Sequence, residues 1–150
     1  MKIRYATQIR ESDCGPIALL NLLKWLGMRV TVREHHGHLC WMCNLIDGFG
    51  SSDSDLTRAL SHLRRNNFSF KYRRKPKLKT ILSHLKNGGA VILVYPNEVG
   101  LHACFIPSQN KKKISVVNAF VGKAVNEITM KTLEKWVSSA NSSAWLISKN

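Results

Sequence analysis

The sequence is short of negative charge. Asp and Glu supply nine of its 150 residues, whereas Lys and Arg supply 23, so the formal net charge at pH 7 is +14. Between Leu56 and Asn97 there is no acidic residue at all. That segment carries ten cations: Arg58, Arg64, Arg65, Lys71, Arg73, Arg74, Lys75, Lys77, Lys79 and Lys86. An excess this large calls for an acidic partner, whether nucleic acid, an anionic membrane surface or an acidic protein.

Long apolar runs are also missing. The run at 17–26 is interrupted by Asn21 and Lys24, and the run at 90–95 is only as long as a strand. Neither approaches the roughly 20 residues that a membrane-spanning helix needs. Residues 1–13 contain no apolar region of the kind found in secretory signals. We therefore expect a soluble, cytoplasmic protein that does not insert into a membrane.

Cysteine is scarce as well. Four cysteines, at 14, 40, 43 and 104, are too few and too unevenly spaced for a disulfide scaffold in a chain of this length. Each is better interpreted as a thiol that packs, ligates or reacts. The composition, 44% hydrophobic and 21% charged, is that of an ordinary globular protein. Because internal repeats and linker-like stretches are absent, residues 1–150 are expected to form one domain.

The order of predicted elements indicates an α+β fold. Apolar stripes at helical spacing predict four helices, at 14–26, from about 55, at 77–86 and at 129–137, with Asp13 as the cap of the first. Runs rich in β-branched residues predict strands at 90–95, 101–106, 114–119 and 144–147, and the alternation at 68–72 is compatible with another. A turn at 111–113 joins two strands into a hairpin. The helices come mainly first and the strands afterwards, which is typical of an α+β fold and differs from the alternating strands and helices of βαβ units.

Cys14 is the first candidate for chemistry. It opens the most apolar predicted helix, where the positive end of the helix dipole and unpaired backbone N–H groups lie. That position is expected to lower the pKa of the thiol and to favour the nucleophilic thiolate. The alternative is that Cys14 is a small buried apolar residue, as lone cysteines usually are.

Three further residues supply what a thiol nucleophile needs. Gln8 lies six residues upstream across a tight turn, where its side-chain amide could join the Cys14 N–H in an oxyanion hole. His102 begins one predicted strand and Asn118 ends the next. The hairpin would let the Asn118 carbonyl oxygen accept from one His102 nitrogen while the other nitrogen faces the thiol.

These residues stand in segments that resemble the bacteriocin-processing, double-glycine-leader cysteine peptidases, which have a papain-like fold. The resemblance is carried by Gln8-Ile-Arg-Glu-Ser-Asp-Cys14-Gly-Pro-Ile-Ala-Leu, by Gly100-Leu-His102-Ala-Cys-Phe-Ile, by Ile114-Ser-Val-Val-Asn118-Ala-Phe and by the closing helix at 128–136. It implies an α+β papain-like fold with N-terminal helices packed on a C-terminal antiparallel sheet. It also implies that Cys14 is the nucleophile and His102 the general base and acid. Asn118 would then orient His102, and Gln8 would donate to the oxyanion.

The sequence departs from the family pattern at the third member. Asn118-Ala119 stands where the family has Asp-Pro, which removes a negative charge beside His102. Papain-like enzymes as a group also use Asn at this place, so the resemblance still implies activity, with weaker stabilisation of the imidazolium. Family members often precede a membrane-spanning transporter, whereas here we expect a standalone domain.

A cluster of soft ligands at 35–43 admits two interpretations. Its members are His35, His36, His38, Cys40 and Cys43. A Cys-x-x-Cys beside histidines is a plausible zinc half-site, but a structural zinc site usually pairs two such knuckles, and no second pair occurs at a usual spacing. We therefore expect no metal and no cofactor. We interpret the segment as a polar loop at the rim of a substrate cleft, with Trp41 and Met42 packed inward.

Two functions remain as hypotheses. The first is a soluble cysteine peptidase, or related thiol acyl-hydrolase, that acts on a protein or peptide through Cys14, His102, Asn118 and Gln8. The basic surface would favour an acidic substrate. The second is a catalytically idle form of this fold that binds nucleic acid or an acidic protein through the basic segment 58–86. The presence of Gln8, Cys14 and His102 together favours the peptidase, because a pure binding role does not require them. The replacement of Asp by Asn at position 118 favours the binding protein.

Overall fold

The structure, a computed structural model, describes residues 2–46, 50–109, 113–120 and 123–150. Its α-helices are α1 (Cys14–Trp25), α2 (Val32–Met42), α3 (Asp53–Leu63), α4 (Leu78–Lys86) and α5 (Met130–Val137). Its strands are β1 (Phe68–Arg74), β2 (Ala90–Asn97), β3 (Gly100–Gln109), β4 (Ile114–Phe120), β5 (Lys123–Ile128) and β6 (Ser143–Lys149). Short 3-10 turns, η1 (Glu11–Asp13) and η2 (Arg64–Asn66), precede α1 and follow α3.

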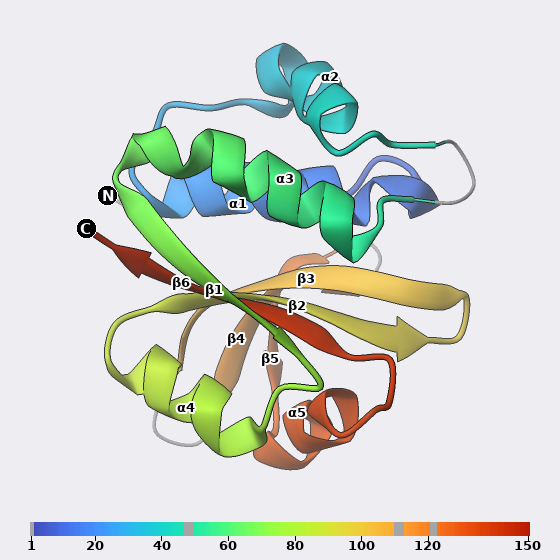
Figure 1. The fold of residues 1–150 in the computed structure, drawn as a ribbon, viewed down its shortest axis with the longest axis vertical. Helices are drawn as coiled ribbons and strands as arrows, with labels where there is room; N and C mark the ends of the chain where they lie inside the picture. The colour runs from blue at the N-terminus through green and yellow to red at the C-terminus, as the bar shows by residue number, and fades with distance from the viewer. Residues whose placement is uncertain (1, 47–49, 110–112, 121–122) are drawn as a thin grey trace.

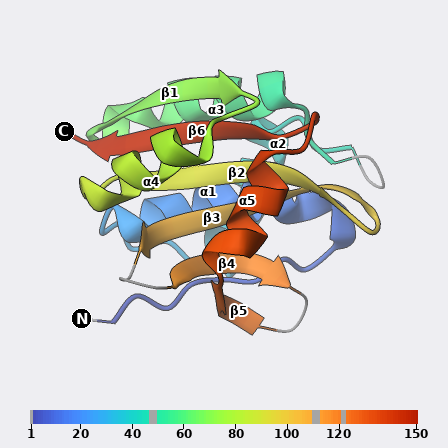
Figure 2. The same cartoon turned by 90° about the horizontal axis from the view of Figure 1, so that it is seen from below.

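The six strands form one antiparallel sheet between two layers of helices. Their order is β1-β6-β2-β3-β4-β5. Helices α1, α2 and α3 lie on one side of the sheet, and α4 and α5 lie on the other (Figure 1). Seen from the α4 and α5 side, the N-terminal segment passes beside β4 (Figure 2). The sheet therefore separates two apolar cores, and alternate residues of β2 point into each: Ile92 into the first, and Leu93 into the second.

Helix α1 lies at the centre of the first core because its sequence leaves almost no polar face. Nine of its 12 residues are buried, and it packs on β3, β4 and α2. Its buried polar side chain, Asn21, exchanges two hydrogen bonds with the backbone of Ala6, at 2.7 and 3.0 Å. These bonds satisfy the amide and attach the N-terminal segment to the helix, which places residues 2–8 next to the start of α1.

Helices α3 and α4 follow their apolar stripes. Helix α3 begins at a capping box between Ser52 and Asp55 and buries Leu56, Ala59 and Leu60 in the first core. Helix α4 buries Ile81 and Leu85 in the second core, on the other side of the sheet. Both arrangements confirm helices that periodicity alone predicts.

Most predicted elements are confirmed, and two were missed. The predicted helices correspond to α1, α3, α4 and α5, and the predicted strands to β1, β2, β3, β4 and β6. Strand β5 was not predicted, and the predicted turn at 111–113 lies mostly outside the described residues. No helix in the described part of the chain is long and apolar enough to cross a membrane.

The prediction of a loop at 35–43 is wrong, because residues 32–42 form α2. Thr31 caps this helix by accepting from the backbone N–H of Glu34 at 3.2 Å. Among its residues only Leu39 and Met42 are buried, so its apolar stripe is too narrow to be recognised in the sequence. Met42 packs inward as predicted, whereas Trp41 is 73% exposed. The exposed ring instead stacks on His38, with ring centroids 5.7 Å apart.

Candidate active site

Cys14 is the first residue of α1 and is partly exposed. The backbone N–H groups of Ala103, on β3, and of Gly15 hydrogen-bond its sulfur and act to lower the thiol pKa. Burial outweighs them, and the negative charge of Asp13 adds to it, so the pKa of Cys14 is raised above its ordinary value. The expectation that the helix start would lower this pKa is therefore wrong in sign. At neutral pH the thiol is protonated in the resting protein.

His102 lies on β3, one residue before the Ala103 that contacts the Cys14 sulfur. Its ring is buried and meets the ring of Tyr95 edge-on at 5.7 Å between centroids. Its Nε2 lies 2.6 Å from the main-chain oxygen of Asn118, so Nε2–H is the donor of that bond. Burial lowers the pKa of His102, and the bond to Asn118 opposes the shift. The imidazole is therefore neutral at pH 7, with Nδ1 as its basic nitrogen.

Asn118 occupies a distorted point of β4. Its φ of 61° lies in the left-handed region, which Asn tolerates better than most residues, and the pairing of β4 with β5 shifts between Val117 and Phe120. The main-chain carbonyl of Asn118 meets His102, while its side chain meets Gln8 instead. Asn118 therefore meets His102 as predicted, but through its backbone. The prediction that its side chain orients His102 is wrong, because that side chain binds Gln8.

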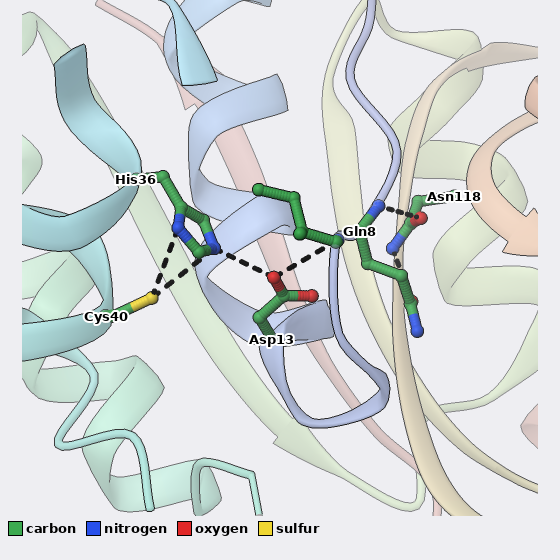
Figure 3. Close-up of polar contacts among 6 residues, drawn as sticks. Gln8, Asp13, His36, Cys40 and Asn118 are labelled. Atoms are coloured by element: carbon green, nitrogen blue, oxygen red, sulfur yellow. Dashed lines mark hydrogen bonds and ion pairs between the residues drawn. The ribbon is translucent and has the colours of Figure 1, made fainter. Parts of the chain in front are cut away.

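Gln8 is held by the Asn118 side chain through two hydrogen bonds (Figure 3). The Gln8 backbone N–H donates to Asn118 Oδ1 at 2.9 Å. Asn118 Nδ2 donates to Gln8 Oε1 at 3.0 Å. Three of the four predicted site residues, Gln8, Asn118 and His102, thus form one hydrogen-bonded chain, and the fourth, Cys14, lies against the residue next to His102.

A cleft of about 890 Å³ begins at Cys14 and runs between α3 and the sheet. Leu101 and Ala103 line it next to Cys14. Farther along, Arg58 of α3 and Arg74 at the end of β1 also line it. Because residues alternate along a strand, Arg74 shares a face with Tyr72, another lining residue, and the neighbouring Arg73 does not. The ten cations of the basic segment are therefore not equivalent.

The sequence did not reveal the contacts of Asp13 and His36. Asp13 was expected to cap α1, but its side chain makes no capping bond. Its Oδ2 instead lies 2.8 Å from His36 Nε2 and accepts from the Ile9 N–H at 3.2 Å. An Asp before a reactive Cys is visible in the sequence, but nothing in residues 32–42 indicates which histidine reaches it. Within the described ranges, no group of three His, Cys, Asp or Glu side chains could hold a metal ion.

Comparison with known proteins gives solved structures only. No family model and no curated protein matches the sequence. The peptidase domain of Streptococcus ComA, a bifunctional ABC transporter involved in quorum sensing, is similar at a TM-score of 0.73 and 14% identity, covering 99% of this chain and 100% of that one. A double-glycine-motif protease from an AMS/PCAT transporter, solved with its leader peptide, is similar at a TM-score of 0.66 and 16% identity, covering 98% and 93%.

A third solved structure is also similar. A C39-like peptidase from Bacillus anthracis is similar at a TM-score of 0.66 and 11% identity, covering 99% of this chain and 96% of that one. Because these sequence identities are low, the comparisons show the fold alone, and the chemistry has to be argued from the residues of the site. The predicted resemblance to double-glycine-leader peptidases is confirmed at that level. The chain has the α+β, papain-like fold of the C39 peptidase domains over nearly its whole length.

Proposed function

We propose that this protein is a cysteine peptidase whose nucleophile is Cys14. The observation that carries the proposal is the hydrogen-bonded chain from Gln8 through Asn118 to His102, beside a partly exposed cysteine that opens a cleft. His102 and Asn118 are buried polar residues, and burying polar groups costs free energy that an apolar core at this place would avoid. The likeness of the fold to peptidase domains supports the same conclusion.

The first step is general-base catalysis between two neutral groups. With Nε2–H bonded to the Asn118 carbonyl, His102 offers Nδ1 as the base. As the Cys14 sulfur attacks the substrate carbonyl carbon, Nδ1 takes the thiol proton, and the π-electron pair of the carbonyl moves to its oxygen. When the tetrahedral intermediate collapses, the C–N bond breaks and the imidazolium returns the proton to the leaving amine. Water, deprotonated by the same nitrogen, then attacks the thioester carbonyl carbon. The C–S bond breaks as the imidazolium returns the proton to the Cys14 sulfur, and the acid product leaves.

Gln8 is the proposed donor to the oxyanion. Its Oε1 is bound by Asn118 Nδ2, so the Nε2 group is the end that can donate to a substrate oxygen. The Cys14 backbone N–H, at the start of α1, supplies a second donor. In this scheme Asn118 is a positioning residue twice over: its main chain orients His102, and its side chain orients Gln8.

The substrate in this proposal is a peptide with acidic side chains. Arg58 is partly committed to Asp55, whose Oδ1 lies 3.1 Å from its guanidinium. Arg74 is exposed at the far end of the cleft and carries the charge available to a substrate carboxylate. The protease of the AMS/PCAT transporter was solved with a leader peptide. In this proposal, an extended peptide substrate passes from Cys14 towards Arg74.

A peptidyl vinyl sulfone tests the proposal without knowledge of the natural sequence. The probe should label wild-type protein at Cys14, as mapped by mass spectrometry, and Cys14→Ser should abolish labelling while leaving the melting temperature within a few degrees. A library of acidic peptides should be cleaved by wild type and not by Cys14→Ser. Labelling that shifts to Cys40 or Cys43, or cleavage that survives Cys14→Ser, would reject Cys14 as the nucleophile.

A further inference from the structure

A second polar contact lies on the other side of the turn that joins Gln8 to Cys14. Asp13 immediately precedes Cys14, and its carboxylate is fully buried, at 0% exposure. Its Oδ2 accepts from the Ile9 N–H at 3.2 Å and lies 2.8 Å from Nε2 of His36, which comes from α2 (Figure 3). The pair thus connects three parts of the chain: the segment carrying Gln8, the residue before the nucleophile and the polar helix α2.

The carboxylate is costly to keep at this position. A buried carboxylate requires strong partners, and among the described atoms Asp13 Oδ1 has none. The charge of Asp13 also raises the pKa of Cys14, which opposes formation of the thiolate. A contribution to thiol reactivity therefore does not explain this carboxylate, whereas its bonding geometry does.

That geometry completes the fixation of the turn. On the β4 side, the Asn118 side chain binds the backbone N–H and the side chain of Gln8. On the α2 side, Asp13 binds the next backbone N–H, that of Ile9. Within the turn, the Asp13 N–H donates to the Arg10 carbonyl at 3.3 Å. The backbone N–H of Gln8 is therefore bound to Asn118 of β4, and the next one, that of Ile9, is bound to Asp13, the partner of α2.

His36 is itself held in place on α2. The Cys40 sulfur, one helical turn further along, lies 3.5 Å from its Nε2 and 3.9 Å from its Nδ1. A sulfur at similar distances from both nitrogens packs against the ring and limits its rotation. The neighbouring His35 instead lies at the helix start, where its Nδ1 is 3.2 Å from both the backbone N and the backbone O of Thr31. Among the contacts described, it has none with the turn.

We propose that the Asp13–His36 pair is a positioning clamp that fixes Gln8 relative to Cys14, and that α2 acts on the reaction through this clamp. The inference rests on the proposed function in one respect, the role of Gln8 as oxyanion donor. Cys14 is already fixed by α1, so the part of the site that the clamp orders is the Gln8–Ile9 segment.

Two measurements, peptide cleavage and thiol alkylation, can distinguish loss of the clamp from a general loss of stability. Peptide cleavage needs both the thiol and the oxyanion donor, whereas alkylation of a thiol by iodoacetamide needs no oxyanion donor. Loss of the clamp should therefore impair cleavage and spare alkylation of Cys14. Removing one oxyanion donor lowers kcat by about 100- to 1,000-fold, so the effect of His36→Leu should lie below that limit, at about 10- to 100-fold, with KM nearly unchanged.

The experiment compares His36→Leu with His35→Leu and His36→Gln. His35→Leu changes the adjacent residue and should leave kcat unchanged, while His36→Gln keeps a donor for Asp13 and should restore most of the activity. In the double variant Gln8→Ala/His36→Leu, kcat should equal that of Gln8→Ala alone, since the clamp acts through Gln8. Amide hydrogen exchange of residues 2–13 should be faster in His36→Leu and unchanged in His35→Leu.

Each readout can overturn the proposal. Additive losses in the double variant, a parallel fall in alkylation, or unchanged exchange at residues 2–13 would each reject the clamp. If His36→Leu does not fold, Asp13→Ala, which removes both the acceptor of the Ile9 N–H and the partner of His36, should show faster exchange at residues 2–13; unchanged exchange there also rejects the clamp. If wild type cleaves nothing, the proposed peptidase function fails, and the exchange measurements still decide whether the clamp orders the turn.

Discussion

The two ends of the cleft differ in kind. Around Cys14 and His102 the side chains are largely covered by protein, and burial shifts the pKa of each towards its neutral form. At the other end, Arg58 and Arg74 are exposed and charged. The difference indicates a division of labour. Under the proposed function, the neutral, hydrogen-bonded groups at one end carry out the reaction, and the solvent-screened charges at the other end bind the substrate.

The largest expected effect comes from removing the Asn118 side chain. Asn118→Gly keeps a backbone that tolerates φ near 61° and releases Gln8, so kcat should fall about 100- to 1,000-fold if Gln8 donates to the oxyanion. Asn118→Ala should lose as much activity and, in addition, about 1 kcal/mol of stability from strain in the left-handed region. Peptide cleavage and urea unfolding measure the two effects separately.

Asn118→Asp and Asn126→Ala serve as the controls for that comparison. The aspartate keeps an acceptor for the Gln8 N–H but loses the donor to Gln8 Oε1, so its activity should fall between those of wild type and Asn118→Ala. Asn126, on β5, bonds only the Lys123 carbonyl among the contacts described, and its loss should leave cleavage unchanged. Wild-type activity in Asn118→Gly would remove Asn118 from the site.

The dependence on pH tests whether the buried end is neutral. Because the pKa of Cys14 is raised, its thiolate fraction and its rate of iodoacetamide alkylation should increase about tenfold per pH unit from pH 7 to 9. Because the pKa of His102 is lowered, its protonation should reduce kcat/KM only below about pH 6.5. Alkylation that is fast and independent of pH between 5 and 7 would instead indicate a thiolate–imidazolium pair.

Charge reversal at the open end should have a smaller effect. Arg74→Glu should raise KM for an acidic peptide about 3- to 10-fold, and added salt should shrink the difference. Arg73→Glu makes the same change in net charge one residue away, on the other face of β1, and should have little effect. The two variants should label equally at Cys14. If both abolish retention on DNA or RNA while peptide KM stays constant, the nucleic-acid-binding hypothesis is favoured instead.

The smallest effect is expected on the outer surface of α2. Trp41 is 73% exposed, so Trp41→Ala should change the free energy of unfolding by no more than about 0.5 kcal/mol. Leu39, on the same helix, is 2% exposed, and Leu39→Ala should cost about 2–5 kcal/mol. Thermal or urea unfolding of the two variants measures the contrast. A large loss of stability in Trp41→Ala would instead support the inward packing of Trp41 that the sequence predicted.

Prediction from the sequence succeeded where burial dominates. Helix α1 could be predicted because its apolar residues run through almost every position. Gln8, Asn118 and His102, which are far apart in the sequence, are hydrogen-bonded to one another in the structure, and their catalytic roles stay a prediction. Helix α2 could not be predicted, because its position depends on the polar contact between His36 and Asp13 as much as on its two buried residues. Polar contacts between distant segments leave no periodic pattern.

Two properties of the site depend on details that no local pattern encodes. The role of Asn118 follows from a left-handed residue in an irregular strand, which turns its carbonyl towards His102 and its amide towards Gln8. The sign of the Cys14 pKa shift follows from how deeply β3 covers the helix start. Helix position and desolvation act in opposite directions, and only the packed structure shows that desolvation is larger.

The bond between Gln8 and Asn118 joins residues 110 positions apart in the chain. Closing a loop of that length costs about 4 kcal/mol of chain entropy, so the contact forms late, once the sheet has been assembled. During synthesis the nucleophile leaves the ribosome long before the residues that orient its partners. A nascent or truncated chain therefore contains Cys14 without the contact between Gln8 and Asn118. Under the proposed peptidase function, cleavage activity would be acquired only when translation has passed β4.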